Sequence, residues 1–178
     1  MSMMPIGAFA LLLVASFGVL QLIRAEEVIL MEPFDPLKML GTWYVWKRNV
    51  HLTDQTSNAR CLRVAIEHDG SSGDIYKMVV KWLDPNNGNL DVSLFVVDDR
   101  SHPARFFFKS DEHKIALSVL GTDYDNWAVA HGMLGLKDSY FVATRKLPLE
   151  GAALGDIENV LNKNQVSKDF VIIDHSSC

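Results

Sequence analysis

Side chains that could perform catalysis or hold a metal are few in this chain, and they are widely spaced. No pair of histidines has the spacing of a metal motif such as His-Glu-x-x-His, and no Gly-x-Ser-x-Gly turn or phosphate-binding glycine loop occurs. The six histidines are His51, His68, His102, His113, His131 and His175. We therefore expect no catalytic residue, no metal and no cofactor.

The two cysteines, Cys61 and Cys178, are the other candidates for side-chain chemistry. An even number of cysteines in an exported chain predicts one disulfide, and the N-terminal segment described next predicts export. In the chain-entropy model, a disulfide that closes a loop of about 100 residues stabilises the fold by roughly 4.7 kcal/mol. The alternative is a pair of free thiols.

The segment from Ile6 to Ile23 carries no charged residue and is followed by Arg24 and Ala25. An apolar N-terminal run that ends near a small residue is typical of a secretory signal peptide. We therefore expect cleavage to remove residues 1–25 and to leave residues 26–178 as a secreted, extracellular domain without stable membrane insertion. The alternative is a membrane anchor, because about 20 apolar residues can span a bilayer.

The charge of the chain argues against some partners. Its formal net charge is −5 at pH 7, and its Lys and Arg residues form no basic block. Nucleic acids and anionic membrane surfaces attract clustered positive charge. We therefore expect no nucleic-acid partner.

The remaining sequence predicts a small set of elements. Eight short runs rich in Val, Phe, Tyr and Ile are separated by turn sequences such as Asp-Pro-Asn-Asn-Gly. They span residues 41–50, 57–68, 74–83, 89–97, 103–110, 113–120, 126–133 and 138–147. Apolar residues at helical spacing follow at positions 154, 157, 160 and 161, and a last apolar run covers 169–174.

Eight short antiparallel strands form either a sandwich or a barrel. The hairpin-length connections favour an all-β, eight-stranded, up-and-down antiparallel β-barrel with one C-terminal α-helix packed outside. Alternation of apolar and polar residues indicates the core-facing side of several strands. That side comprises Tyr76, Met78, Val80, Trp82, Leu90, Val92, Leu94, Val96, Ala104, Phe106, Phe108, Ile115, Leu117 and Val119.

Three short motifs in this order resemble those of the lipocalins, a family of secreted eight-stranded calyx proteins. Gly41-Thr42-Trp43 is similar to the Gly-x-Trp of the first strand, and Thr122-Asp123-Tyr124 is similar to the motif before the seventh strand. Arg145 stands where the third motif has its Arg or Lys. The resemblance covers about residues 33–178, and the position of Cys61 with a C-terminal partner is similar to the apolipoprotein D-like and insect bilin-binding branch.

The resemblance implies structural roles for these motif residues. Trp43 would cover the closed base of the barrel, with Arg145 packed over its indole. Thr122, Asp123 and Tyr124 would brace the adjacent loop, and Gly41 would open the first strand. The alternative is that Trp43 is an ordinary buried aromatic residue.

The resemblance also implies that a small hydrophobic ligand, such as a retinoid, fatty acid, steroid, bilin or carotenoid, binds inside the barrel. Family geometry would turn Ala128, Ala130, Phe141 and Ala143 inward. The expected ligand-contacting residues are Tyr76, Met78, Val80, Leu90, Val92, Leu94, Phe106, Phe108, Leu117, Val119 and Phe141. The alternative is that these side chains fill the barrel and leave no cavity.

Three further functions stay open at this point. The barrel could be a scaffold whose open-end loops bind a receptor or another protein, with loop 49–57 as the candidate surface. A free Cys61 could act as a nucleophile, as in one enzymatic branch of the family. His51 could ligate haem, as in some lipocalins of blood-feeding animals.

Overall fold

The computed structural model describes residues 28–49, 58–68, 70, 75–98, 101–108, 116–134, 137–149, 151–166 and 169–178. The expected signal peptide lies outside these residues, as do His51 and every residue of loop 49–57 except Asn49.

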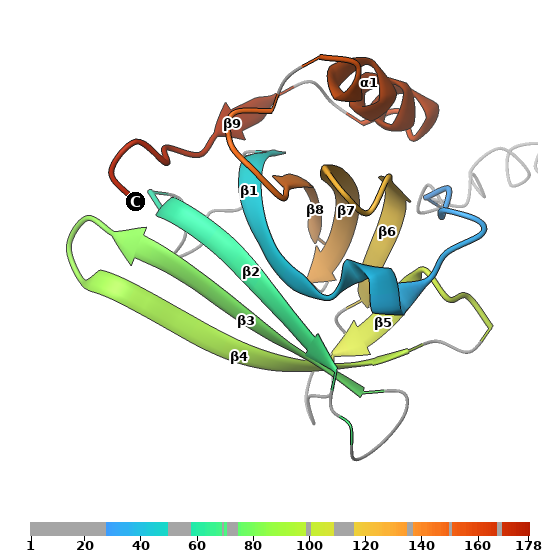
Figure 1. The fold of residues 1–178 in the computed structure, drawn as a ribbon, viewed down its shortest axis with the longest axis horizontal. Helices are drawn as coiled ribbons and strands as arrows, with labels where there is room; N and C mark the ends of the chain where they lie inside the picture. Colours follow the sequence, from blue (N-terminus) through green and yellow to red (C-terminus); the bar gives the residue numbers. More distant parts are fainter. Residues whose placement is uncertain are drawn as a thin grey trace, which may run out of the picture.

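The described chain folds as predicted into eight main strands, a C-terminal helix and a short tail strand (Figure 1). A 3₁₀ turn, η1 (Pro36–Met39), precedes the first strand. The strands and the helix are β1 (Gly41–Asn49), β2 (Arg60–His68), β3 (Ile75–Asp84), β4 (Gly88–Asp98), β5 (Arg105–Phe108), β6 (Ala116–Thr122), β7 (Trp127–Leu134), β8 (Lys137–Thr144), α1 (Ala153–Lys163) and β9 (Phe170–Ile172).

The strands form the predicted up-and-down barrel rather than a sandwich. Each strand from β2 to β8 pairs antiparallel with the next one in the chain, and β1 pairs with both β8 and β2. Because β1 joins the first and the last of these strands, the sheet curls round and closes on itself (Figure 1). The closure is partial at β4, because only Val96, Val97 and Asp98 of that strand pair with β5.

The junction between β1 and β2 has two parts. Near its start, β1 pairs directly with β2 from Gly41 to Tyr44, whereas its last three residues, 47–49, pair with β9. The C-terminal tail therefore completes the barrel wall where β1 and β2 separate. The predicted disulfide between Cys61 and Cys178 holds this tail, with 5.6 Å between the two Cα atoms.

Helix α1 packs outside the barrel against β6 and β7, as expected. Ile157 and Leu161 are buried against Trp127 and Val129 on the outer side of β7. Gly121 allows the helix to come close, because a Cβ atom there would lie 2.7 Å from the side chain of Val160. The predicted apolar stripe began at Leu154, and this part of the prediction is wrong. Leu154 lies about one turn before Ile157, and its side chain is exposed.

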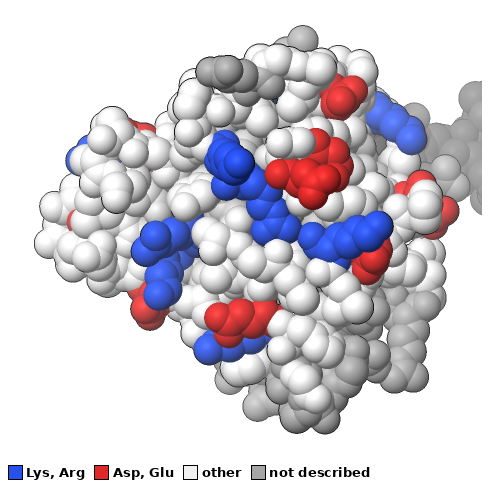
Figure 2. Space-filling model, in the orientation of Figure 1, with Lys and Arg blue, Asp and Glu red and all other residues white. Residues whose placement is uncertain are grey.

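Charged side chains are scattered over the visible face of the molecule (Figure 2). Several Lys and Arg side chains form a short band near the middle of this face, with acidic side chains beside it, and wide uncharged areas surround them (Figure 2). This face therefore carries charge of both signs close together.

Candidate functional site

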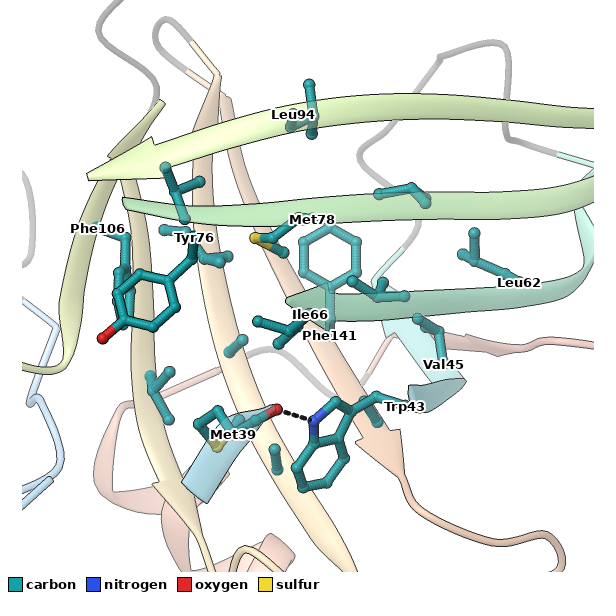
Figure 3. A pocket seen from close by; sticks show the side chains of 18 of the residues that line it. Met39, Trp43, Val45, Leu62, Ile66, Tyr76, Met78, Leu94, Phe106 and Phe141 are labelled. Atoms are coloured by element: carbon teal, nitrogen blue, oxygen red, sulfur yellow. Dashed lines mark hydrogen bonds between the residues drawn. The ribbon is translucent and has the colours of Figure 1, made fainter. Parts of the chain in front are cut away.

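Trp43 lies at the closed end of the barrel and is 2% exposed. Its indole Nε1 donates a hydrogen bond of 2.8 Å to the carbonyl oxygen of Met39, in the 3₁₀ turn that precedes β1 (Figure 3). The guanidinium carbon of Arg145 lies 3.7 Å from the centre of the Trp43 ring, within the range of a cation–π contact. The structure thus has the stacked pair that the motifs imply.

Arg145 also bonds to three backbone carbonyls around the base. Its Nε donates to Tyr124, its Nη1 to Thr42 and its Nη2 to Lys38, at 3.1, 3.2 and 3.0 Å. Partial burial lowers the pKa of the guanidinium from its ordinary value, and the negative charge of Asp125 opposes that shift. An arginine remains charged at any physiological pH, so it can tie three chain segments together as a permanent cation.

Gly41 is required by the same contact. Its φ is +99°, and a Cβ atom at this position would lie 3.1 Å from Nη1 of Arg145. A larger residue would be strained in this backbone conformation and would push the guanidinium away. The glycine of the first motif is therefore explained by the arginine of the third.

The loop between β6 and β7 is held by its own side chains. Thr122 Oγ1 donates to the carbonyl of Trp127 and accepts from the backbone N–H of Tyr124. Asp123 accepts from the side chain and backbone of Asn126 and from the backbone N–H of Trp127. Partial burial would raise the pKa of Asp123, but these hydrogen bonds outweigh it and hold the pKa below its ordinary value.

A cavity of about 450 Å³ occupies the barrel above this base. Trp43 and Met39 form its lower end, and side chains from most of the strands point into it (Figure 3). Val92 lines the cavity and is 40% exposed, so the cavity reaches solvent beside β4. The barrel is therefore hollow, and the alternative of a filled interior is wrong.

Nine of the eleven expected ligand-contacting residues line this cavity. Leu90 does not, because it lies two residues closer than Val92 to the β3–β4 turn; the side chain of Phe108 lies outside the described part of the structure. The nine are Tyr76, Met78, Val80, Val92, Leu94, Phe106, Leu117, Val119 and Phe141. The small residues Ala128, Ala130 and Ala143 also line it, as family geometry implies. Contact of these residues with a ligand stays a prediction.

The structure adds lining residues that the expected set did not include. Four of them are apolar side chains of β1 and β2 that alternation from Trp43 and Leu62 identifies, and two others, on β3 and β4, were already on the predicted core-facing side. The added residues are Pro36, Met39, Val45, Leu62, Val64, Ile66, Trp82 and Val96. Arg48 is the exception, because no pattern in the sequence predicts a cation at this position.

The remaining candidate chemistry is limited. Both cysteines form the disulfide, so Cys61 offers no free thiol for the enzymatic alternative. Within the described ranges, no group of three or more His, Cys, Asp or Glu side chains is placed to hold a metal ion. Among these same residues, no helix combines the length and the apolar character needed to cross a membrane.

Solved structures with the same fold come from several arthropods. Per a 4, a major allergen from cockroaches, is 18% identical, with a TM-score of 0.69 over 82% of this chain and 91% of that one. Insecticyanin from the tobacco hornworm Manduca sexta is 16% identical, with a TM-score of 0.68 over 85% and 86%. Lobster apocrustacyanin A1 is also 16% identical, with a TM-score of 0.66 over 80% and 81%.

These proteins are lipocalins, and the chain has the lipocalin fold. No model of a protein family matches the sequence, and no curated protein matches it either. At identities below 20% the structural likeness establishes the fold and leaves the ligand open.

Proposed function

We propose that this protein is a secreted binding protein that carries a small hydrophobic molecule inside its barrel. The observation that carries the proposal is the cavity of about 450 Å³, whose lining is apolar except for very few groups. This volume falls in the range of roughly 300–1,000 Å³ that is usual for small-molecule sites. Burial of the ligand's apolar surface, at about 25 cal/mol per Å², would supply the driving force.

The shape of the lining favours binding over catalysis. Met78 can adapt to the outline of a ligand, and the small side chains of Ala128 and Ala130 leave volume on the opposite wall. Retinoids, fatty acids, steroids, bilins and carotenoids are the ligand classes that we propose to test. The barrel needs no cofactor for this function.

Secretion is the second part of the proposal. Disulfides persist in oxidising compartments, and the Cys61–Cys178 bond therefore supports an extracellular location. We propose residues 1–25 as a cleaved signal peptide and residues 26–178 as the mature domain. N-terminal sequencing of protein recovered from the medium of expressing cells tests this, and a chain retained in the membrane with Met1 intact would contradict it.

Ligand binding can be measured with the protein's own tryptophans. Trp43 and Trp82 both line the cavity, so a ligand should change their fluorescence. We expect one or more members of a panel of retinoids, fatty acids, steroids and tetrapyrroles to quench it and to add its mass in native mass spectrometry. A purified protein that is coloured would identify a bound pigment directly.

A pair of matched variants makes this test specific for the cavity. Ala130→Phe places a large ring inside the cavity, whereas Ser93→Phe places the same ring at an exposed position between the lining residues Val92 and Leu94. We expect Ala130→Phe to weaken binding strongly and Ser93→Phe to leave it unchanged. Folded protein that binds no member of the panel, or equal binding by both variants, would contradict the proposal.

A further inference from the structure

An irregularity in β1 turns one cationic side chain toward the cavity. Val45 pairs with Ala143 and Lys47 pairs with Val142, so Trp46 is an extra residue on the β1 side. A bulge of this kind re-aims the side chains that follow it. Without it, alternation from Trp43 and Val45 would turn Lys47 inward and the residue after it outward.

The contacts of Lys47 show that the opposite arrangement holds. Its Nζ lies 3.3 Å from a carboxylate oxygen of Glu158 on α1, and it also lies over the rings of Trp46 and Phe170. All of these groups are outside the barrel. Arg48, the next residue, lines the cavity.

Arg48 is the only charged residue among the described residues that line the cavity, and it is 4% exposed. A buried cation is expensive unless anionic or hydrogen-bonding groups surround it. Arg48 already interacts with another part of the protein. A guanidinium has five N–H donors, however, so it can keep an internal partner and still bind a carboxylate.

A second donor lies at the same end of the cavity. The indole Nε1 of Trp82 is buried and has no hydrogen-bond partner among the described residues. Trp82 and Phe141 pack against the same cluster of Val45, Leu62 and Ile173, and Phe141 is the Cα partner of Arg48 in the sheet. The described lining thus offers donors at this end and no acidic side chain.

We propose that the ligand is an amphipathic carboxylic acid, with its carboxylate at Arg48 and its apolar body toward Trp43. This inference rests on the proposed carrier function and goes further by naming the head group. The apolar chain would occupy the lower cavity, where the Nε1 of Trp43 is already bonded to Met39. Trp82 would donate a further hydrogen bond to the acid group.

The test compares ligands that differ only in the head group. Oleic acid is measured against oleyl alcohol and methyl oleate, and retinoic acid against retinol, by fluorescence titration of the full mature protein. A charge-assisted hydrogen bond corresponds to about tenfold or more in affinity. We expect the acids to bind about tenfold or more tightly than the matched alcohols and esters.

Variants then assign that preference to one residue. Arg48→Met should remove the preference for acids and leave binding of the alcohols, and Trp82→Phe should lower acid binding by a smaller factor. Lys47→Met is the matched control, because it removes the neighbouring positive charge outside the barrel and should keep the preference. Arg48→Lys, which retains charge but loses the bidentate geometry, covers the case in which Arg48→Met does not fold.

The outcomes separate the two proposals. If acids and alcohols bind equally to the unmodified protein, or if Lys47→Met rather than Arg48→Met removes the preference, the head-group inference is wrong and the carrier function stands. If no hydrophobic ligand binds at all, the carrier function itself is wrong. A preference for acids that Arg48→Met removes and Lys47→Met keeps supports both.

Discussion

The two ends of the barrel are built in different ways. At the base, Trp43 and Arg145 stack, and the arginine also bonds to three backbone carbonyls. In the upper half, the wall is lined by apolar side chains and completed by a C-terminal tail that the disulfide holds. The base therefore depends on directional contacts between a few residue types, whereas the cavity depends on volume and apolar character. Changes at the base should act on stability, and changes in the cavity should act on binding.

The largest effect on stability should come from the base. Trp43→Ala removes a fully buried indole and its hydrogen bond to Met39, and such core substitutions cost about 3–5 kcal/mol. We expect this loss in the free energy of unfolding, measured by denaturant titration. Trp43→Phe is the control, because it keeps most of the buried ring and should cost clearly less. Unchanged stability with loss of ligand binding alone would show that Trp43 belongs to the binding site and not to the base.

The disulfide should give the next largest effect, at the other end of the barrel. Its cysteines are 117 residues apart, and removal of a native disulfide typically costs about 2–4 kcal/mol. We expect the double variant Cys61→Ser with Cys178→Ser to lose stability in this range and to show faster amide exchange in β9 than in β6 and β7. Equal protection of the tail with and without the disulfide would mean that hydrogen bonds alone hold it.

The contrast between the ends also explains how far the sequence could be interpreted. The base could be predicted because Gly41, Trp43 and Arg145 match motifs of a known family, and that resemblance implies their structural roles. The cavity wall follows from alternation, which identifies a face but not how much empty volume remains behind it. The inward position of Arg48 could not be predicted. The extra residue at Trp46 reverses the alternation of inward and outward side chains after it, and no sequence pattern indicates this extra residue. The short connections between strands favour a barrel over a sandwich. The contact that closes the barrel is the pairing of β1 with β8, which joins segments far apart in the sequence.

A smaller effect is expected from Arg145→Gln. The change removes the cation–π contact and weakens three hydrogen bonds at a partly exposed site, so we expect a loss of about 2–3 kcal/mol in unfolding free energy. Ligand affinity should stay within a factor of about 2, because Arg145 does not line the cavity. Lys146→Gln, at the exposed neighbouring position, is the control and should change stability by less than about 0.5 kcal/mol. If Arg145→Gln lowers the free energy of ligand binding by more than the free energy of unfolding, the base and the cavity do not act separately.

The smallest effect concerns the pH dependence of the loop at the base. Partial burial would raise the pKa of Asp123, but hydrogen bonds from Asn126 and from backbone N–H groups hold it below its ordinary value of about 3.9. Above that value the carboxylate is ionised in both the folded and the unfolded chain, so its stabilisation is fully present at about pH 6. As the pH falls, the unfolded chain takes up the proton first, and the stabilisation is lost as the pH passes through the lower folded pKa.

Asp123→Asn tests this contribution. The difference in unfolding free energy between the unmodified protein and the variant should be constant between about pH 5.5 and 7 and should shrink toward about pH 3. Its size should stay below about 1 kcal/mol, because the carboxylate is largely exposed and solvent screens its interactions. Asp91→Asn, at an exposed position on β4, is the matched control for loss of one negative charge. A difference in unfolding free energy that grows as the pH falls would mean that the protonated carboxyl stabilises the loop. The hydrogen bonds to the carboxylate would then not explain why this motif has an aspartate.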